Sequence, residues 1–246
     1  MSAGFITAVW SPKGGVGKTL LSTAVALQLA QKQRTVIVDG NPDNPDLATL
    51  MQAPGTPNIC GWPGQVKPEA VEAHLVRRSS RLFVLPGPAR YVDEGVLTKE
   101  VMEDALRTLK AAGMAVVVDL SCSLRDSTLM ALDLADRVLI PVTLDLLSII
   151  PLVKLTKEQD ILKLPIHKFK VVINRHTDTK EITLDDIREY SFCPVAGVIP
   201  SSKVAAGAIN SGNCDAALGP TSPVGKAVAG FLSELMPAEE AVGVGR

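Results

Sequence analysis

The chain has 246 residues, of which 46% are hydrophobic and 4% aromatic, and its formal net charge is −1. This length and apolar content suit one large α/β domain. The near-zero charge argues against bulk attraction to nucleic acid or anionic lipid, and the few aromatic residues argue against a base-stacking surface. No run approaches the about 20 apolar residues of a membrane span, and no signal-peptide pattern is present. We expect a cytoplasmic protein.

Short apolar runs recur along the chain without polar alternation, which is typical of strands covered on both faces. They occupy residues 5–10, 36–38, 82–85, 115–118, 138–140, 171–173 and 195–199. Helical patterns lie between them, at 20–33, 68–77, 97–112, 128–135, 146–162, 184–190 and 222–235. This alternation predicts a doubly wound, mostly parallel sheet with helices on both faces.

The same pattern predicts a single domain over residues 1–246, with a flexible tail after about residue 237. Residues 53–68 are rich in proline and glycine, so we expect a long surface loop there. The cysteines are scattered without Cys-x-x-Cys spacing, at Cys60, Cys122, Cys193 and Cys214. We expect reduced, mostly buried thiols, and a metal site formed across a dimer stays open as an alternative.

A glycine-rich loop joins the first apolar run to the first helical pattern, and this is the setting in which such loops bind phosphate. The glycines let successive N–H groups point inward, and no Cβ blocks a triphosphate. Lys18 would reach the β- and γ-phosphates, and the Thr19 hydroxyl would bind Mg²⁺. The sequence therefore predicts a P-loop NTPase whose nucleotide contacts come from Lys13, Gly14, Gly15, Val16, Gly17, Lys18, Thr19 and Leu20.

Lys13 is unusual, because it follows Pro12 at the position where such loops ordinarily begin with glycine. A second cation here is more charge than one mononucleotide site needs. Two carboxylates complete the expected site: Asp39 and Asp119 each follow a buried strand at the edge where ligands of a parallel sheet gather. A carboxylate at this position holds Mg²⁺ through its water shell, so Thr19, Asp39 and Asp119 are the expected metal residues.

The loop at residues 13–19 resembles the deviant Walker A motif of the MinD/ParA ATPases, and the resemblance extends over nearly the whole chain. Residues 36–42 are similar to the family's second motif, a strand ending in Asp-x-Asp-Pro, and the strand before Asp119 is similar to its Walker B strand. Other segments look most like the CpaE/TadZ branch, which is associated with pilus assembly: residues 85–90, 128–136, 198–200 and 208–212.

The resemblance implies an ATP-dependent homodimer in which Lys13 reaches the partner's phosphates, so that ATP joins the two protomers. It implies ATP or ADP with Mg²⁺ as the ligands. It also places Asn174 against the adenine, with Arg175 and Pro200 near the base, because an amide can both donate and accept at a purine edge.

The chain departs from the family pattern at Asn41, where a second aspartate is usual. The implied catalytic set is therefore Lys13, Lys18, Asp39 and Asn41. An amide cannot act as a base, so we expect slow hydrolysis. Residues 120–122 also lack the proline and glycine common after the Walker B strand, which leaves open whether that segment positions water.

The favoured function is a molecular switch whose ATP-bound dimer recruits an unidentified partner of a pilus, secretion or polar complex, by which it would reach the pole or the inner membrane face. DNA segregation is a second possibility, although it needs a basic surface that the composition does not provide. A third is metallocentre insertion, which would need paired cysteines, and a fourth, an ATP-dependent ligase, lacks a substrate motif. The acidic C-terminal segment does not resemble a membrane-binding helix.

Overall fold

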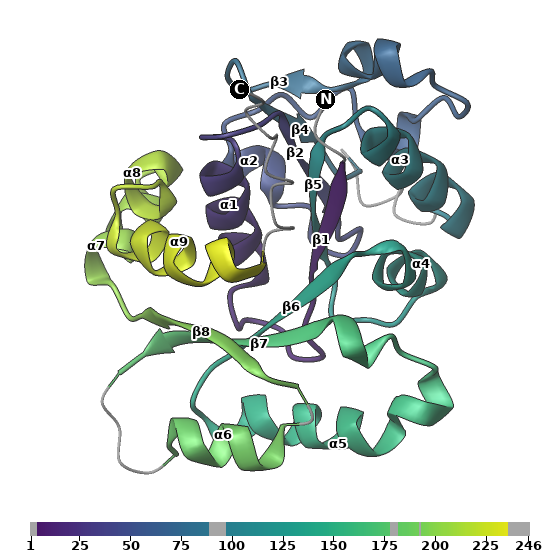
Figure 1. Ribbon diagram of the computed structural model, residues 1–246. Helices are drawn as coiled ribbons and strands as arrows, with labels where there is room; N and C mark the ends of the chain where they lie inside the picture. The colour runs from purple at the N-terminus through teal and green to yellow at the C-terminus, as the bar shows by residue number, and fades with distance from the viewer. Residues whose placement is uncertain (1–3, 89–96, 178–181, 192, 236–246) are drawn as a thin grey trace, which may run out of the picture.

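The buried apolar runs form an eight-stranded sheet in the computed structural model, which describes residues 4–88, 97–177, 182–191 and 193–235 (Figure 1). The order across the sheet is β3-β4-β2-β5-β1-β6-β7-β8, and every neighbouring pair is parallel except β3 and β4. The strands are β1 Phe5–Val9, β2 Thr35–Gly40, β3 Val76–Arg77, β4 Leu82–Leu85, β5 Ala115–Leu120, β6 Arg137–Val142, β7 Phe169–His176 and β8 Val195–Pro200. The predicted doubly wound, mostly parallel sheet is confirmed.

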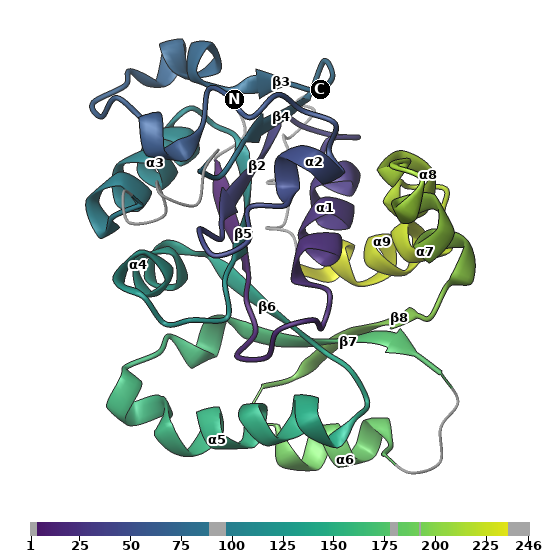
Figure 2. The ribbon, with the colours of Figure 1, turned by 180° about the vertical axis from the view of Figure 1, so that it is seen from behind.

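Helices cover both faces of this sheet. The α-helices are α1 Lys18–Leu29, α2 Leu47–Leu50, α3 Lys99–Ala111, α4 Asp126–Leu134, α5 Leu146–Leu162, α6 Leu184–Tyr190, α7 Lys203–Asn210, α8 Cys214–Leu218 and α9 Pro223–Leu235. Helices α1, α8 and α9 lie on one side and α3 and α4 on the other, and Figure 2 gives the reverse view. Among the described residues, no helix combines the length and apolarity needed to cross a membrane.

Each face of the sheet has its own hydrophobic cluster, because side chains alternate along a strand. On β5, Val116 and Val118 pack in the cluster shared with α3, α4 and α5, whereas Ala115 and Val117 pack in the cluster shared with α1 and α9. The same alternation carries the next residue, Asp119, onto the α1 face. Strand register thus decides which strand-end side chains meet the loop before α1.

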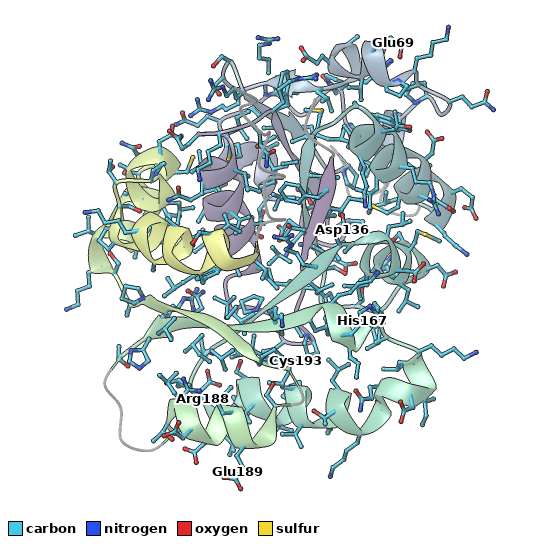
Figure 3. All side chains as sticks on the ribbon, in the orientation of Figure 1. Glu69, Asp136, His167, Arg188, Glu189 and Cys193 are labelled. Carbon is cyan, nitrogen blue, oxygen red and sulfur yellow. The ribbon has the colours of Figure 1, made fainter. Side chains whose placement is uncertain are left out.

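The amino edge of the sheet is tied by a carboxylate just before β6. Asp136, labelled in Figure 3, accepts a 2.7 Å hydrogen bond from the Ile6 backbone N–H and two from Lys110 Nζ, at 2.6 and 2.8 Å. Both oxygens are therefore used for fixing β1 against β6 and α3. The functional residues predicted from the sequence lie at the opposite, carboxyl edge.

Two predictions about the segment after α2 hold only in part. The helix predicted at 68–77 is a 3-10 helix, Pro68–His74, followed by β3, because the chain turns to pair Val76 with Val84 at the sheet edge. The loop at 53–68 is not merely a surface loop: it contains the 3-10 helix Ile59–Gly61, buries Ile59 and Trp62, and places Trp62 Nε1 2.7 Å from Asp104 Oδ2. Burial of Ile59 and Trp62, together with the hydrogen bond to Asp104 of α3, holds this segment in place.

Two predictions concern residues outside the described part of the chain. The tail after about residue 237 lies there, as do residues 89 and 90 of the stretch that resembles the CpaE/TadZ branch. The single domain over all 246 residues therefore stays a prediction.

Two glycines of α9 provide a matched test of the packing. A Cβ on Gly225 would lie 2.0 Å from the Gly219 carbonyl oxygen, whereas one on Gly230 meets nothing within 4 Å. We expect Gly225→Ala to lower the free energy of unfolding by about 1–3 kcal/mol, because the clash is with backbone that cannot rotate away. Gly230→Ala should raise it by up to about 1 kcal/mol through helix propensity. Urea unfolding measures both, and equal effects would contradict this packing.

Candidate functional site

The phosphate-loop residues lie between the carboxyl end of β1 and the first turn of α1, as the sequence predicts. Gly15 has φ 77° and Gly17 φ 93°, left-handed values at which any other residue is strained. Positions 14 and 15 are open, since a Cβ there meets nothing within 4 Å. The first N–H groups of a helix have no intrahelical acceptor, so the start of α1 presents donors to an anion.

The two lysines of the loop differ in their surroundings. Lys18 starts α1, and its Nζ donates a long 3.5 Å hydrogen bond to the Lys13 carbonyl. The Lys13 backbone N–H donates to Ser11 Oγ at 3.4 Å, and its side chain forms no ion pair with any described residue. The Lys18 side chain therefore binds back to the loop through the Lys13 carbonyl. The half-exposed Lys13 ammonium group has no counter-ion among the described residues.

Asp39 and Asp119 are buried side by side on the α1 face, because β2 and β5 are paired in a register that matches these two residues. Burial, followed by repulsion from Asp119, raises the pKa of Asp39 well above its ordinary value. Burial also raises the pKa of Asp119 to about 6, although a hydrogen bond with the Thr19 hydroxyl and the charge of Lys18 oppose the shift. Burial therefore disfavours the charged form of both carboxyl groups unless a cation lies near them.

The two carboxylates are used differently. Asp39 accepts hydrogen bonds from the backbone N–H groups of Asn41 at 3.0 Å and Leu47 at 3.2 Å, so it fixes the segment that follows β2. Oδ1 of Asp119 is buried and has no hydrogen-bond partner among the described residues. An unsatisfied buried carboxylate oxygen is costly unless a cation or water reaches it.

This donor set fits Mg²⁺. A carboxylate and a hydroxyl, Asp119 and Thr19, are hard oxygen ligands next to a loop that would supply phosphate oxygens. No three His, Cys, Asp or Glu side chains form a metal-binding group within the described ranges.

A cavity of about 210 Å³ lies beside the loop and brings together the residues predicted to surround the base. Leu20, Asn174, Arg175 and Pro200 all line it, and so does the first part of α7. Its other walls are mostly apolar: Leu21, Ile199, Ala205, Ala206, Ile209, Leu218 and Val224. A flat, largely apolar ligand portion suits such a cavity. The helices that complete it, α7 and α8, were not predicted.

The segments after β2 and β5 are joined by residues that the sequence analysis did not single out. Asp43 forms an ion pair with Arg125 and accepts a 3.4 Å hydrogen bond from Ser123 Oγ. Asn41 Nδ2 donates to the Asn44 carbonyl at 2.8 Å. A carboxylate two positions after Asn41 was visible in the sequence, but its partner is 82 residues away. The two strand-end segments therefore share one network.

The fold and this loop define the class: a P-loop α/β domain with its ligand edge at the carboxyl ends of the strands. Residues 7–213 match the family described as the CobQ/CobB/MinD/ParA nucleotide binding domain. Since that match covers most of the 246 residues, the chain belongs to this family, whose MinD and ParA members are ATPases.

Individual relatives agree with this assignment. The septum site-determining protein MinD of Escherichia coli is 27% identical over 257 aligned positions, covering 95% of this chain and 92% of that protein. A ParA family ATPase from Chlorobium tepidum has the same fold, with a TM-score of 0.83, 21% identity and coverage of 95% and 99%. MinD from Pyrococcus horikoshii, solved with Mg-ADP, gives a TM-score of 0.75 at 16% identity, with coverage of 94% and 96%.

Replacing Asp119 tests the buried charge. A carboxyl whose pKa rises from 3.8 to about 6 on folding binds its proton more tightly in the native state. Native stability therefore falls as the pH rises through that window, and the loss is complete above it. We expect Asp119→Asn to be more stable than the natural protein in metal-free buffer at pH 7, by on the order of 2 kcal/mol.

The difference should vanish well below pH 3.8, where Asp119 is protonated in both states, and thermal unfolding from about pH 3 to pH 8 measures it. Asp133→Asn, at an exposed carboxyl on α4, is the matched control for the loss of one formal charge. A pH-independent difference between Asp119→Asn and the natural protein would contradict the assigned burial cost.

Proposed function

We propose that this protein is an ATP-dependent molecular switch: Mg²⁺-ATP binds at the loop of residues 13–19, two protomers associate across the nucleotides, and slow hydrolysis separates them. The observation that carries the proposal is the convergence of a two-lysine loop, a buried acidic pair and a cavity for a base at one edge of the sheet. Family membership supports nucleotide binding, and the Mg-ADP in the Pyrococcus horikoshii relative supports the choice of ligand.

In this proposal each site residue has a role that its position supports. The backbone of Gly14, Gly15, Val16 and Gly17 surrounds the phosphates, and Lys18 neutralises the β- and γ-phosphates. Thr19 and Asp119 hold Mg²⁺, which would supply charge neutralisation at the phosphates when bound.

Asp39 keeps the segment after β2 in place and adds negative charge near the metal. Leu20, Asn174, Arg175 and Pro200 surround the base in the cavity.

The dimer is supported by a patch of exposed apolar side chains on the same edge. Leu146, Leu147 and Ile150 form the first turns of α5 and are 62%, 66% and 42% exposed. Helix α5 begins just after β6, the neighbour of β1, so this patch lies at the loop's edge of the sheet. A second copy facing this edge would cover the patch and bring its own Lys13 to the first copy's phosphates.

Light scattering tests the dimer. The natural protein should double in mass with Mg²⁺-ATP, and both Lys13→Ala and Leu147→Asp should stay monomeric. The first lacks the cation given to the partner, and the second places a charge in the apolar contact. Ile161→Asp is the matched control, because Ile161 is 81% exposed at the far end of the same helix. A constant mass of the natural protein with and without ATP would refute the switch.

Asn41 is proposed to limit hydrolysis. Its backbone N–H bonds Asp39 and its side chain bonds the Asn44 carbonyl, so it is ordered, but its neutral amide cannot take a proton from water. A positioned general base contributes on the order of 10²–10⁴ in rate. We expect Asn41→Asp to hydrolyse bound ATP at least about tenfold faster in a single-turnover assay. Asn44→Asp is the neighbouring control, and fast hydrolysis by the natural protein would count against this role.

We assign the switch to assembly or localisation of a pilus, secretion or polar complex, through the segments that resemble the CpaE/TadZ branch. A ParA-like role in DNA partitioning is the competing function. The formal net charge of −1 gives no bulk attraction to DNA, and acids pair with some of the basic side chains, for example Glu72 with Arg34 and Arg77 and Asp215 with Arg78. ATP-dependent binding of duplex DNA that weakens with salt would favour partitioning instead.

A further inference from the structure

Asn174 makes a direct contact with the phosphate loop, in addition to lining the base cavity. Its Nδ2 donates a 2.7 Å hydrogen bond to the carbonyl oxygen of Val16, a residue 158 positions earlier in the chain. Asn174 is only 7% exposed, and it comes from β7, which lies two strands away from β1 in the sheet. The contact therefore connects the phosphate loop, which follows β1, to β7, a strand that does not adjoin β1.

The Asn174 amide is itself held in place. Its Oδ1 accepts a 3.0 Å hydrogen bond from the backbone N–H of Arg175. Arg175 has φ 54°, a left-handed conformation that is uncommon for a residue with a side chain. Since the oxygen end of the amide is fixed by Arg175, the nitrogen end is directed at Val16.

The bond to Val16 also determines the direction of a loop donor. The peptide bond between Val16 and Gly17 is planar, so its C=O and N–H point in opposite directions. Holding the carbonyl toward Asn174 aims the Gly17 N–H away from Asn174. Gly17 is fitted to this arrangement: a Cβ there would lie 2.3 Å from Asn174 Nδ2, and its φ of 93° favours glycine.

We propose that Asn174 is a positioning residue that holds the phosphate loop in its anion-binding shape and thereby couples the base cavity to phosphate binding. The proposal rests on the proposed nucleotide site and extends it. If Asn174 acted on the base alone, its loss would weaken only ligands that carry a base. If it positions the loop, its loss weakens binding of phosphate chains that have no base.

Calorimetry with two probes, Mg²⁺-ATP and inorganic tripolyphosphate with Mg²⁺, separates these cases. Asn174→Leu and Asn174→Ala remove the donor without adding a charge that would repel a polyanion. We expect both variants to lose affinity for both probes by similar factors, on the order of tenfold or more, because a buried carbonyl loses its partner and the loop loses its shape. The control is Ala206→Leu, which fills the base cavity from α7 and should weaken ATP alone.

Unchanged tripolyphosphate affinity in folded Asn174 variants, with weaker ATP binding, would overturn the proposal. Loss of the fold in both variants by circular dichroism would also count against it, since Asn174 would then support the sheet and not the loop. A natural protein that binds ATP but no tripolyphosphate would contradict a preformed anion site. A natural protein that binds neither probe would refute the nucleotide site itself, which is a separate failure.

Discussion

The burial of two carboxylates, Asp39 and Asp119, on adjacent strands is the constraint on which the site depends. Their strands are adjacent and in register, so the fold cannot separate them. The charge of Lys18 and a hydrogen bond with Thr19 act on Asp119, whose Oδ1 has no hydrogen-bond partner among the described residues. A cation held by Asp119 would offset the cost of burying this charge, which gives nucleotide and metal binding a common electrostatic cause.

Much of the fold could be predicted from sequence, because seven of the strands are continuous apolar runs. Such runs are typical of a sheet that is covered by helices on both faces. The failures lie where local pattern and tertiary packing disagree. Residues 68–77 read as a helix, yet pairing of Val76 with Val84 draws the end of this segment into the sheet edge. Ile59 and Trp62 are buried although the proline and glycine around them indicate a surface loop. Nothing local reveals such burial, because the partners come from distant helices.

The site divides in the same way. The loop and the strand-end carboxylates follow from spacing, since side-chain alternation and strand register place them on one face. The pairing of Asp43 with Arg125 could not be read from sequence, because both lie in irregular segments whose approach depends on the loops after β2 and β5. The hydrogen bond between Asn174 and Val16 joins β7 to the loop after β1, two strands away, and likewise could not be predicted from sequence. Motifs predict which residues contact the ligand, whereas the structure shows the hydrogen bonds and ion pairs that those residues form with one another.

The close approach of Gly17 to Asn174 has an evolutionary consequence. With 2.3 Å between an added Cβ and the amide nitrogen, a larger residue at position 17 would displace the Asn174 side chain, and φ 93° would strain its backbone as well. A lineage that keeps the contact between Asn174 and the loop is therefore expected to keep glycine at position 17.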